Sequence, residues 1–312
     1  MKLLISNRNL SFLFLATACV GISFQGLIMR NINYGDVWQI LFFRALGFVF
    51  SITIILSFKY KSAIVEKVKK IGLPGIFIGF LHSVSNLLVV LSFSKTTIAN
   101  TLFTLSSIPF ITAILALIIL KERISLRTTL TMLFAIIGIF IMIKDGLETS
   151  GAYSGNLMAL GSAVCFSSFI IIMRKYNKVD MIPTSLISGI IIIIVSFVVT
   201  RGNIDIPMQE IFLSFFWGAA LNGFMNIALI FSTRFLYASE VTLFTLVEYS
   251  LGPLWVWIFL DEIITKMTLF GGLIVMLSVA TYCVFEVHNQ RNKKRSDSWQ
   301  ARLKISNFHI GR

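Results

Sequence analysis

Long blocks of apolar residues recur along almost the whole of this 312-residue sequence. A helix of about 20 apolar residues spans the ~30 Å hydrocarbon core of a bilayer. Inside lipid the backbone must satisfy its own hydrogen bonds, which a helix does. The sequence therefore predicts an all-α polytopic membrane protein with ten transmembrane helices, at residues 10–28, 37–58, 71–94, 97–120, 125–143, 156–173, 181–200, 211–231, 241–260 and 267–285.

The composition excludes several other classes of protein. Hydrophobic residues make up 56% of the chain and charged residues only 13%, which is too little charge to cover a soluble protein of this size. The net charge of +13 is spread over short loops and a tail, so we expect no nucleic-acid partner. Cys19, Cys165 and Cys283 all fall inside apolar spans, where we expect packing residues and neither disulfides nor metal ligands.

Basic residues predict how the chain is oriented. If the N-terminus is cytoplasmic, 21 of the 27 lysines and arginines fall on the cytoplasmic side and five on the outer side. By the positive-inside rule, both termini are predicted to be cytoplasmic. The apolar run of the first span continues past Ala16-Thr17-Ala18, so we expect a retained helix and no cleaved signal peptide. The expected location is the bacterial inner (plasma) membrane.

Short sequences repeat between the two halves of the chain. Met29–Asp36 reads MRNINYGD, and Met173–Asp180, 144 positions later, reads MRKYNKVD. Thr101–Leu105 and Thr242–Leu246 both read TLFTL, and acidic residues end the fourth and ninth spans. Because five spans precede the second copy, it would enter the membrane from the opposite side. This arrangement is an inverted repeat, which is typical of secondary transporters with a site near the bilayer midplane.

The repeat predicts the domain organisation. Residues 1–9 form a cytoplasmic N-terminus, 10–144 the first five-helix repeat and 145–155 an outer connecting loop. Residues 156–286 form the second five-helix repeat, and 287–312 form a basic cytoplasmic tail.

In these features the chain resembles the drug/metabolite transporter superfamily, specifically its ten-helix EamA-type members. Besides the duplication, the resemblance rests on Pro109 in the fourth span, the LKER sequence of Leu120–Arg123, Gly138 in the fifth span and Gly271-Gly272 in the tenth. The family often has Glu-Pro where this chain has Glu248-Tyr249. The resemblance implies a basket of helices one to four and six to nine around a central cavity, with helices five and ten peripheral.

Glu248 is the first candidate site residue, because an ionisable group inside a membrane span is costly and often functional. It would neutralise a cationic or amino group of the substrate, or carry a coupling proton. A permanently paired or protonated packing residue is the alternative.

Amide and imidazole side chains form a second candidate group. His82 and Asn86 are spaced i, i+4 in the third span, and Asn222 and Asn226 have the same spacing in the eighth. Each pair would share a helix face, and the two faces would oppose each other across the cavity. Asn donates and accepts hydrogen bonds, which suits a polar metabolite. Interhelical hydrogen bonding is the alternative.

Two further residues complete the candidate site. The family commonly has an arginine near the position of Arg44, so the resemblance also implies a role for this residue. Arg44 would bind a carboxylate of the substrate or Glu248; it could instead extend to the membrane interface. Trp255, seven residues after Glu248, would stack on a planar substrate or simply pack.

The function predicted from the sequence is secondary transport of a small polar or amphipathic metabolite by alternating access. No Walker motif is present, so ATP-driven transport by this chain is not expected. A membrane-embedded enzyme and a channel or sensor remain alternatives. The expected partners are a small-molecule metabolite, the lipid bilayer and a proton as coupling ion, with no cofactor. A homodimer is one assembly that the sequence leaves open.

Overall fold

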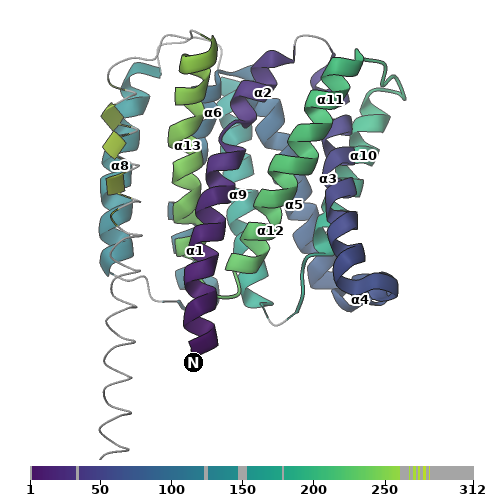
Figure 1. Cartoon of the computed structure of the whole chain (residues 1–312). Coiled ribbons are helices and arrows are strands. Elements are labelled where there is room, and N and C mark those ends of the chain that lie inside the picture. The colour runs from purple at the N-terminus through teal and green to yellow at the C-terminus, as the bar shows by residue number, and fades with distance from the viewer. Residues whose placement is uncertain are drawn as a thin grey trace, which may run out of the picture.

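The computed structural model describes residues 2–32, 35–122, 126–146, 153–177, 179–260 and single positions between 267 and 281. Within these residues the chain is helical and contains no strand. The helices stand side by side as an upright bundle (Figure 1). We call the end where α1 begins and α4 lies the lower end, as drawn there, and the opposite end the upper end.

The longer helices follow the expected spans. They are α1 (Lys2–Ile22), α2 (Gln25–Asn31), α3 (Val37–Tyr60), α5 (Gly72–Lys95), α6 (Ile98–Leu105), α7 (Ile108–Leu115), α8 (Leu126–Gly146), α9 (Tyr153–Lys175), α10 (Thr184–Val199), α11 (Met208–Phe216), α12 (Gly223–Ser232) and α13 (Ala238–Leu260). A 3-10 turn, η1 (Lys61–Ala63), leads into the short helix α4 (Ile64–Lys70), which was not expected from the sequence. Two π-helical segments, η2 (Ala116–Leu120) and η3 (Trp217–Asn222), follow α7 and α11.

Six helical stretches are long and apolar enough to cross a membrane: Arg8–Asn31, Val37–Tyr60, Gly72–Lys95, Tyr153–Lys175, Met208–Ser232 and Ala238–Phe259. Shorter apolar helices occupy Ile108–Leu120, Thr128–Gly138 and Thr184–Val199. An all-helical membrane fold is thus confirmed. The tenth expected span and the basic tail lie largely outside the described residues, so ten helices and the inverted repeat stay predictions.

Three of the expected spans are not regular helices. The first is interrupted at Ser23 and Phe24, between α1 and α2. The fourth is interrupted at Ser106 and Ser107, just before Pro109 in the first turn of α7. Proline lacks a backbone N–H and cannot continue a preceding helix without losing a hydrogen bond. The eighth span contains η3, and single π-helical turns of this kind are frequent at functional sites.

The two halves of the chain interleave. Helix α1 packs against α12 and α13, α3 against α10, α11 and η3, α5 against α9 and α10, and α7 against α9 and α13. The contacts of α1 with α12 and α13 have counterparts in those of α9 with α5 and with α6 and α7. Exchanging the two expected repeats would give this same set of pairs.

Glycine permits the closest of these contacts. A Cβ atom on Gly218 would lie 1.8 Å from the carbonyl oxygen of Arg44, and one on Gly47 would lie 2.2 Å from that of Phe215. Small residues allow membrane helices to approach this closely. The approach of η3 to α3 is what brings Asn222 next to Arg44.

Candidate functional site

A cavity of about 90 Å³ lies inside the bundle. Its walls come from α1, α2, α3, α5, α6, α7, α9, α10, η3, α12 and α13, and no described side chain of α8 is among the lining residues. These elements are the eight helices that the family resemblance placed around a central cavity. The helix expected to be the peripheral fifth, α8, stands at the edge of the bundle beside α13 (Figure 1).

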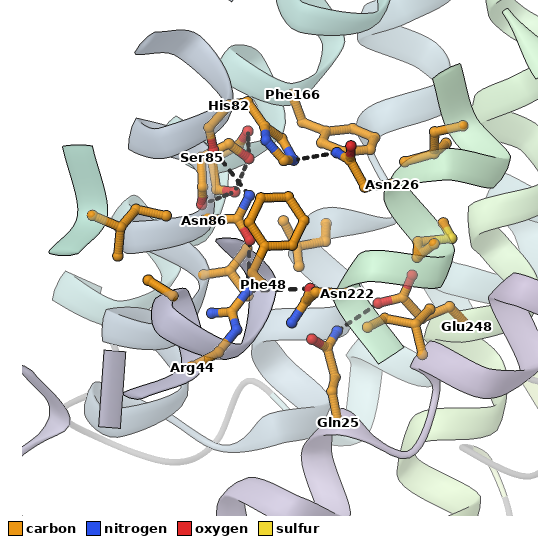
Figure 2. A pocket seen from close by; sticks show the side chains of 18 of the residues that line it. Gln25, Arg44, Phe48, His82, Ser85, Asn86, Phe166, Asn222, Asn226 and Glu248 are labelled. Carbon is orange, nitrogen blue, oxygen red and sulfur yellow. Dashed lines mark hydrogen bonds between the residues drawn. The ribbon is translucent and has the colours of Figure 1, made fainter. Parts of the chain in front are cut away.

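One wall of the cavity carries a buried positive charge. Arg44 is 5% exposed, and its Nη2 donates to Oδ1 of Asn86 at 2.6 Å and to Oδ1 of Asn222 at 3.3 Å (Figure 2). Its guanidinium carbon lies 4.5 Å from the centroid of the Trp217 ring, a cation–π contact. Its Nη1 has no hydrogen-bond partner among the described residues.

Backbone contacts fix the two asparagines that hold this arginine. The amide nitrogen of Asn86 donates to the carbonyl oxygen of His82 at 2.9 Å, and that of Asn222 donates to the carbonyl oxygen of Trp217 at 3.3 Å. Both amide oxygens are thereby turned toward the guanidinium. The π-helical turn matters here, because the bond of Asn222 reaches back five residues instead of four.

The carboxyl group of Glu248 lies in the same cavity. Its side chain is buried on α13, and its Oε1 accepts a hydrogen bond from Nε2 of Gln25 at 2.5 Å. Gln25 is the first residue of α2, directly after the interruption at Ser23 and Phe24. Glu248 and Arg44 form no ion pair with each other or with any other described residue.

A third polar group lies deeper between α5 and α12. The hydroxyl of Ser185 donates to Oδ1 of Asn226 at 2.5 Å, so the amide nitrogen of Asn226 faces Nε2 of His82 at 3.3 Å. In this arrangement Nε2 of the imidazole accepts and Nδ1 carries the proton. The His82 ring stacks on Phe169 with centroids 4.6 Å apart. His82 and Asn226 are separated by 144 positions, which is also the separation of the repeated octapeptides.

Six of the seven candidate residues line the cavity: Arg44, His82, Asn86, Asn222, Asn226 and Glu248. Trp255 does not. Its ring stacks on Phe24 at 4.5 Å and its Nε1 donates to the hydroxyl of Ser23 at 2.7 Å. Trp255 thus packs against the interruption between α1 and α2. The seven residues that separate it from Glu248 place it two helical turns away along α13, outside the cavity lining.

The sequence prediction missed other polar residues at the site. Gln25 was detectable as an amide inside an apolar span. The hydroxyls of Ser85 and Ser162, 2.9 Å apart in the cavity wall, give no such signal, because serine is common in membrane helices as a packing residue. The indole ring of Trp217 lies against the guanidinium of Arg44.

Comparison with known proteins gives the relationship. Residues 9–144 match the EamA-like transporter family. Over this region the chain is similar to EamA-like transporters. Human Solute carrier family 35 member G1 is 36% identical over 112 residues, which make up 32% of this chain and 30% of that protein. Uncharacterized transporter YyaM of Bacillus subtilis (strain 168) is 31% identical over 119 residues, 37% of each chain. The chain therefore matches only about a third of the length of these relatives.

A solved crystal structure shares the fold over a larger region. It has a TM-score of 0.69, and the similarity covers 89% of this chain and 98% of the other at 12% identity. At this identity the likeness concerns the fold alone.

Proposed function

We propose that the protein is a secondary transporter that moves a small zwitterionic metabolite across the membrane by alternating access. The observation that carries the proposal is a guanidinium and a carboxyl group in one cavity, those of Arg44 and Glu248, which are buried and form no ion pair with each other. The similar proteins, which are named as a solute carrier and a transporter, support transport as the activity.

The energetics of burial favour a ligand with two charges. An ionised side chain in the interior of a membrane protein is expensive unless an opposite charge accompanies it. Arg44 and Glu248 would satisfy one another at little cost if they met, yet each is held by neutral amides. In the view of Figure 2, Asn222 and Gln25 lie between them. A substrate carboxylate at Nη1 of Arg44 and a substrate ammonium at Glu248 would neutralise both.

The rest of the lining suits an apolar body between these two ends. Leu41, Phe48 and Tyr249 are among the cavity-lining residues. An α-amino acid with an apolar side chain combines this body with the two charged groups. Apolar side chains combined with placed polar groups are the usual composition of a small-molecule site.

Acid–base catalysis has less support from the same residues. His82 bonds to an amide, and the hydroxyls of Ser85 and Ser162 bond to each other, so within the described chain no cavity-lining hydroxyl is paired with a base. Such a pair is what nucleophilic catalysis requires.

The experiment is a ligand screen followed by a flux measurement. Purified protein is first heated with each neutral L-α-amino acid, because a ligand that binds the folded state raises the apparent melting temperature. L-Leucine is then compared with L-leucinamide, which lacks the carboxylate, and with 4-methylpentanoate, which lacks the ammonium. A lost charged hydrogen bond is worth about 1.5–3 kcal/mol, so each truncated probe should bind at least about tenfold more weakly.

Flux into proteoliposomes then tests transport itself. We expect saturable uptake of the best-binding amino acid and inhibition by its unlabelled form. Equal binding of L-leucine and either truncated probe would refute the two-charge site. Binding of the amino acids without any flux would refute transport.

A further inference from the structure

The second copy of the repeated octapeptide, Met173–Asp180, plays no part in the cavity. Two of its charged residues, Arg174 and Asp180, instead lie at the lower end, where they form ion pairs with residues from both halves of the chain. Arg174 and Asp180 both contact the segment between α12 and α13, residues 233–237, which we call the lower loop.

Arg174 makes three contacts with its surroundings. Its Nε pairs with Oε1 of Glu122 at 2.9 Å, and its Nη1 donates to the carbonyl oxygen of Thr233 at 2.9 Å. Its guanidinium also lies 5.6 Å from the ring centroid of Tyr237. Glu122 in turn accepts a hydrogen bond from the backbone N–H of Ala238 at 3.4 Å. These contacts tie the ends of η2 and α9 to the lower loop and to the start of α13.

Asp180 ties a different part of the bundle to the same loop. Its carboxylate pairs with Arg234 of the lower loop at 3.0 Å, and it accepts hydrogen bonds from Lys59 and Tyr60 at the end of α3. The octapeptide therefore connects α3 on one side and η2 on the other with residues 233–237.

One more ion pair closes the ring around the lower loop. Nη2 of Arg8 on α1 lies 2.6 Å from Oε1 of Glu240 on α13, and the other oxygen of Glu240 accepts from the backbone N–H of Tyr237. The Arg8 guanidinium lies 5.8 Å from the Tyr237 ring. Tyr237 thus lies beside both Arg8 and Arg174.

The lower loop also inserts an apolar side chain beneath the cavity. Leu236 is 0% exposed and belongs to the same hydrophobic cluster as Met225 and Leu229, which line the cavity from α12. Leu236 thus connects the lower loop to the apolar cluster that also borders the cavity, and Arg234 of the same loop belongs to the ion pairs.

We propose that the lower loop is the gate of the cavity on the lower side, held closed by Arg174 and Asp180. The inference rests on the proposed transport function and adds where the path opens. To connect the cavity with the lower end, Leu236 must leave its cluster, and the loop is anchored by these two side chains.

The strength of the anchors suits a gate. The side chains of Arg174 and Glu122 are 16% and 17% exposed, and those of Arg234 and Asp180 are 31% and 21% exposed. Water can therefore solvate the charges as they separate. Each contact of this partly exposed kind favours the closed form by roughly two- to fivefold, so several together hold the gate while a substrate can still shift the equilibrium.

The test measures access to the cavity without any substrate. Ala45, which lines the cavity, is changed to Cys in a chain whose three native cysteines are replaced by Ala. A membrane-impermeant maleimide is then applied from each side, using inside-out and right-side-out vesicles. Arg174→Gln removes three contacts of the lower loop, whereas the matched control Lys175→Gln removes the same charge from an exposed neighbour.

We expect Arg174→Gln to raise the labelling rate from the lower side by about tenfold, with labelling from the upper side not raised and Lys175→Gln without effect. Glu122→Gln should add little to Arg174→Gln, because the two residues share one contact. The milder Arg234→Gln, which leaves Lys59 on Asp180, should raise the rate by about twofold to fivefold. It serves as the deciding variant if Arg174→Gln does not fold.

Labelling from the lower side equal to that of Lys175→Gln, in a folded Arg174→Gln or Arg234→Gln protein, would overturn the gate. If amino-acid flux is observed in the parent protein at the same time, the transport proposal survives that result. Increased labelling without flux of any amino acid would instead support the gate and remove the proposed substrate class.

Discussion

The substitution Glu248→Gln isolates the charge of the carboxylate from its shape. Glutamine has nearly the same size, and its amide oxygen can accept the hydrogen bond that Nε2 of Gln25 donates over 2.5 Å. The contact between α2 and α13 is therefore kept. Because a buried neutral amide costs less than a buried carboxylate, we expect the melting temperature of the purified protein to stay the same or rise.

The effect on the ligand follows from the missing charge. An ammonium that donates to a carboxylate gains about 1.5–3 kcal/mol relative to one left without it. Since 1.4 kcal/mol is a factor of ten, the affinity for a zwitterionic amino acid should fall about 10- to 150-fold. The affinity for 4-methylpentanoate, which has no ammonium, should change little.

The assay uses proteoliposomes that contain the parent protein or the variant at equal density. Uptake is measured as a function of amino-acid concentration, and exchange is measured with unlabelled amino acid on both sides. Saturable uptake by Glu248→Gln with an unchanged half-saturation concentration would refute the role of the carboxylate. Loss of proton-driven uptake with exchange intact would assign Glu248 to a coupling proton instead of the substrate ammonium.

Three further substitutions test other parts of the structure. Arg44→Lys keeps the charge but loses the planar guanidinium, which can bind Asn86 and a substrate carboxylate at the same time. The affinity for the amino acid should therefore fall about tenfold in Arg44→Lys and about 100-fold in Arg44→Gln. Ligand-induced shifts in melting temperature measure both effects. Gly218→Ala should lower stability by about 1–3 kcal/mol or more through overpacking, since its Cβ would lie 1.8 Å from the Arg44 carbonyl oxygen; Gly21→Ala, with no atom within 4 Å, is the neutral control. Burial alone would raise the pKa of Asp180, but hydrogen bonds from Lys59, Tyr60 and the Ile182 N–H, with the charge of Arg234, outweigh it and hold the pKa below its usual 3.8. The stabilisation by Asp180 should therefore be present above about pH 4 and disappear as the pH falls through the lowered pKa; an Asp180→Asn protein whose melting temperature differs from the parent equally at pH 3 and pH 7 would contradict this.

Several features of the fold were predictable because a membrane allows few alternatives. Apolar blocks long enough to span a bilayer must be helices there. Apart from the start of α1 at Lys2, which lies eight residues before the expected start at residue 10, the described helical boundaries agree with the expected spans to within a few residues. Polar residues inside these blocks are costly and turn inward. For that reason all six candidate residues chosen by this criterion line one cavity.

The interruptions of the helices were only partly predictable. Pro109 marks the break between α6 and α7, because its backbone chemistry is local. The break at Ser23 and Phe24 has no such residue, and it is braced from α13 by Trp255. The separation of these residues in the chain, 232 positions from Ser23 to Trp255, hides this support from any local pattern.

By itself, then, the sequence determined that the chain is a helical membrane protein, which residues lie inside its spans, and that its octapeptide occurs twice. The length of an apolar block and the presence of polar residues inside it are local properties, so both can be read directly from the sequence. The tertiary structure decided which charges meet. Arg44 and Glu248 are hydrogen-bonded to neutral amide side chains and not to each other. Arg174 and Asp180 contact the lower loop. Such pairings depend on how helices from the two halves pack together, and the strength of an ion pair depends on distances that only packing sets.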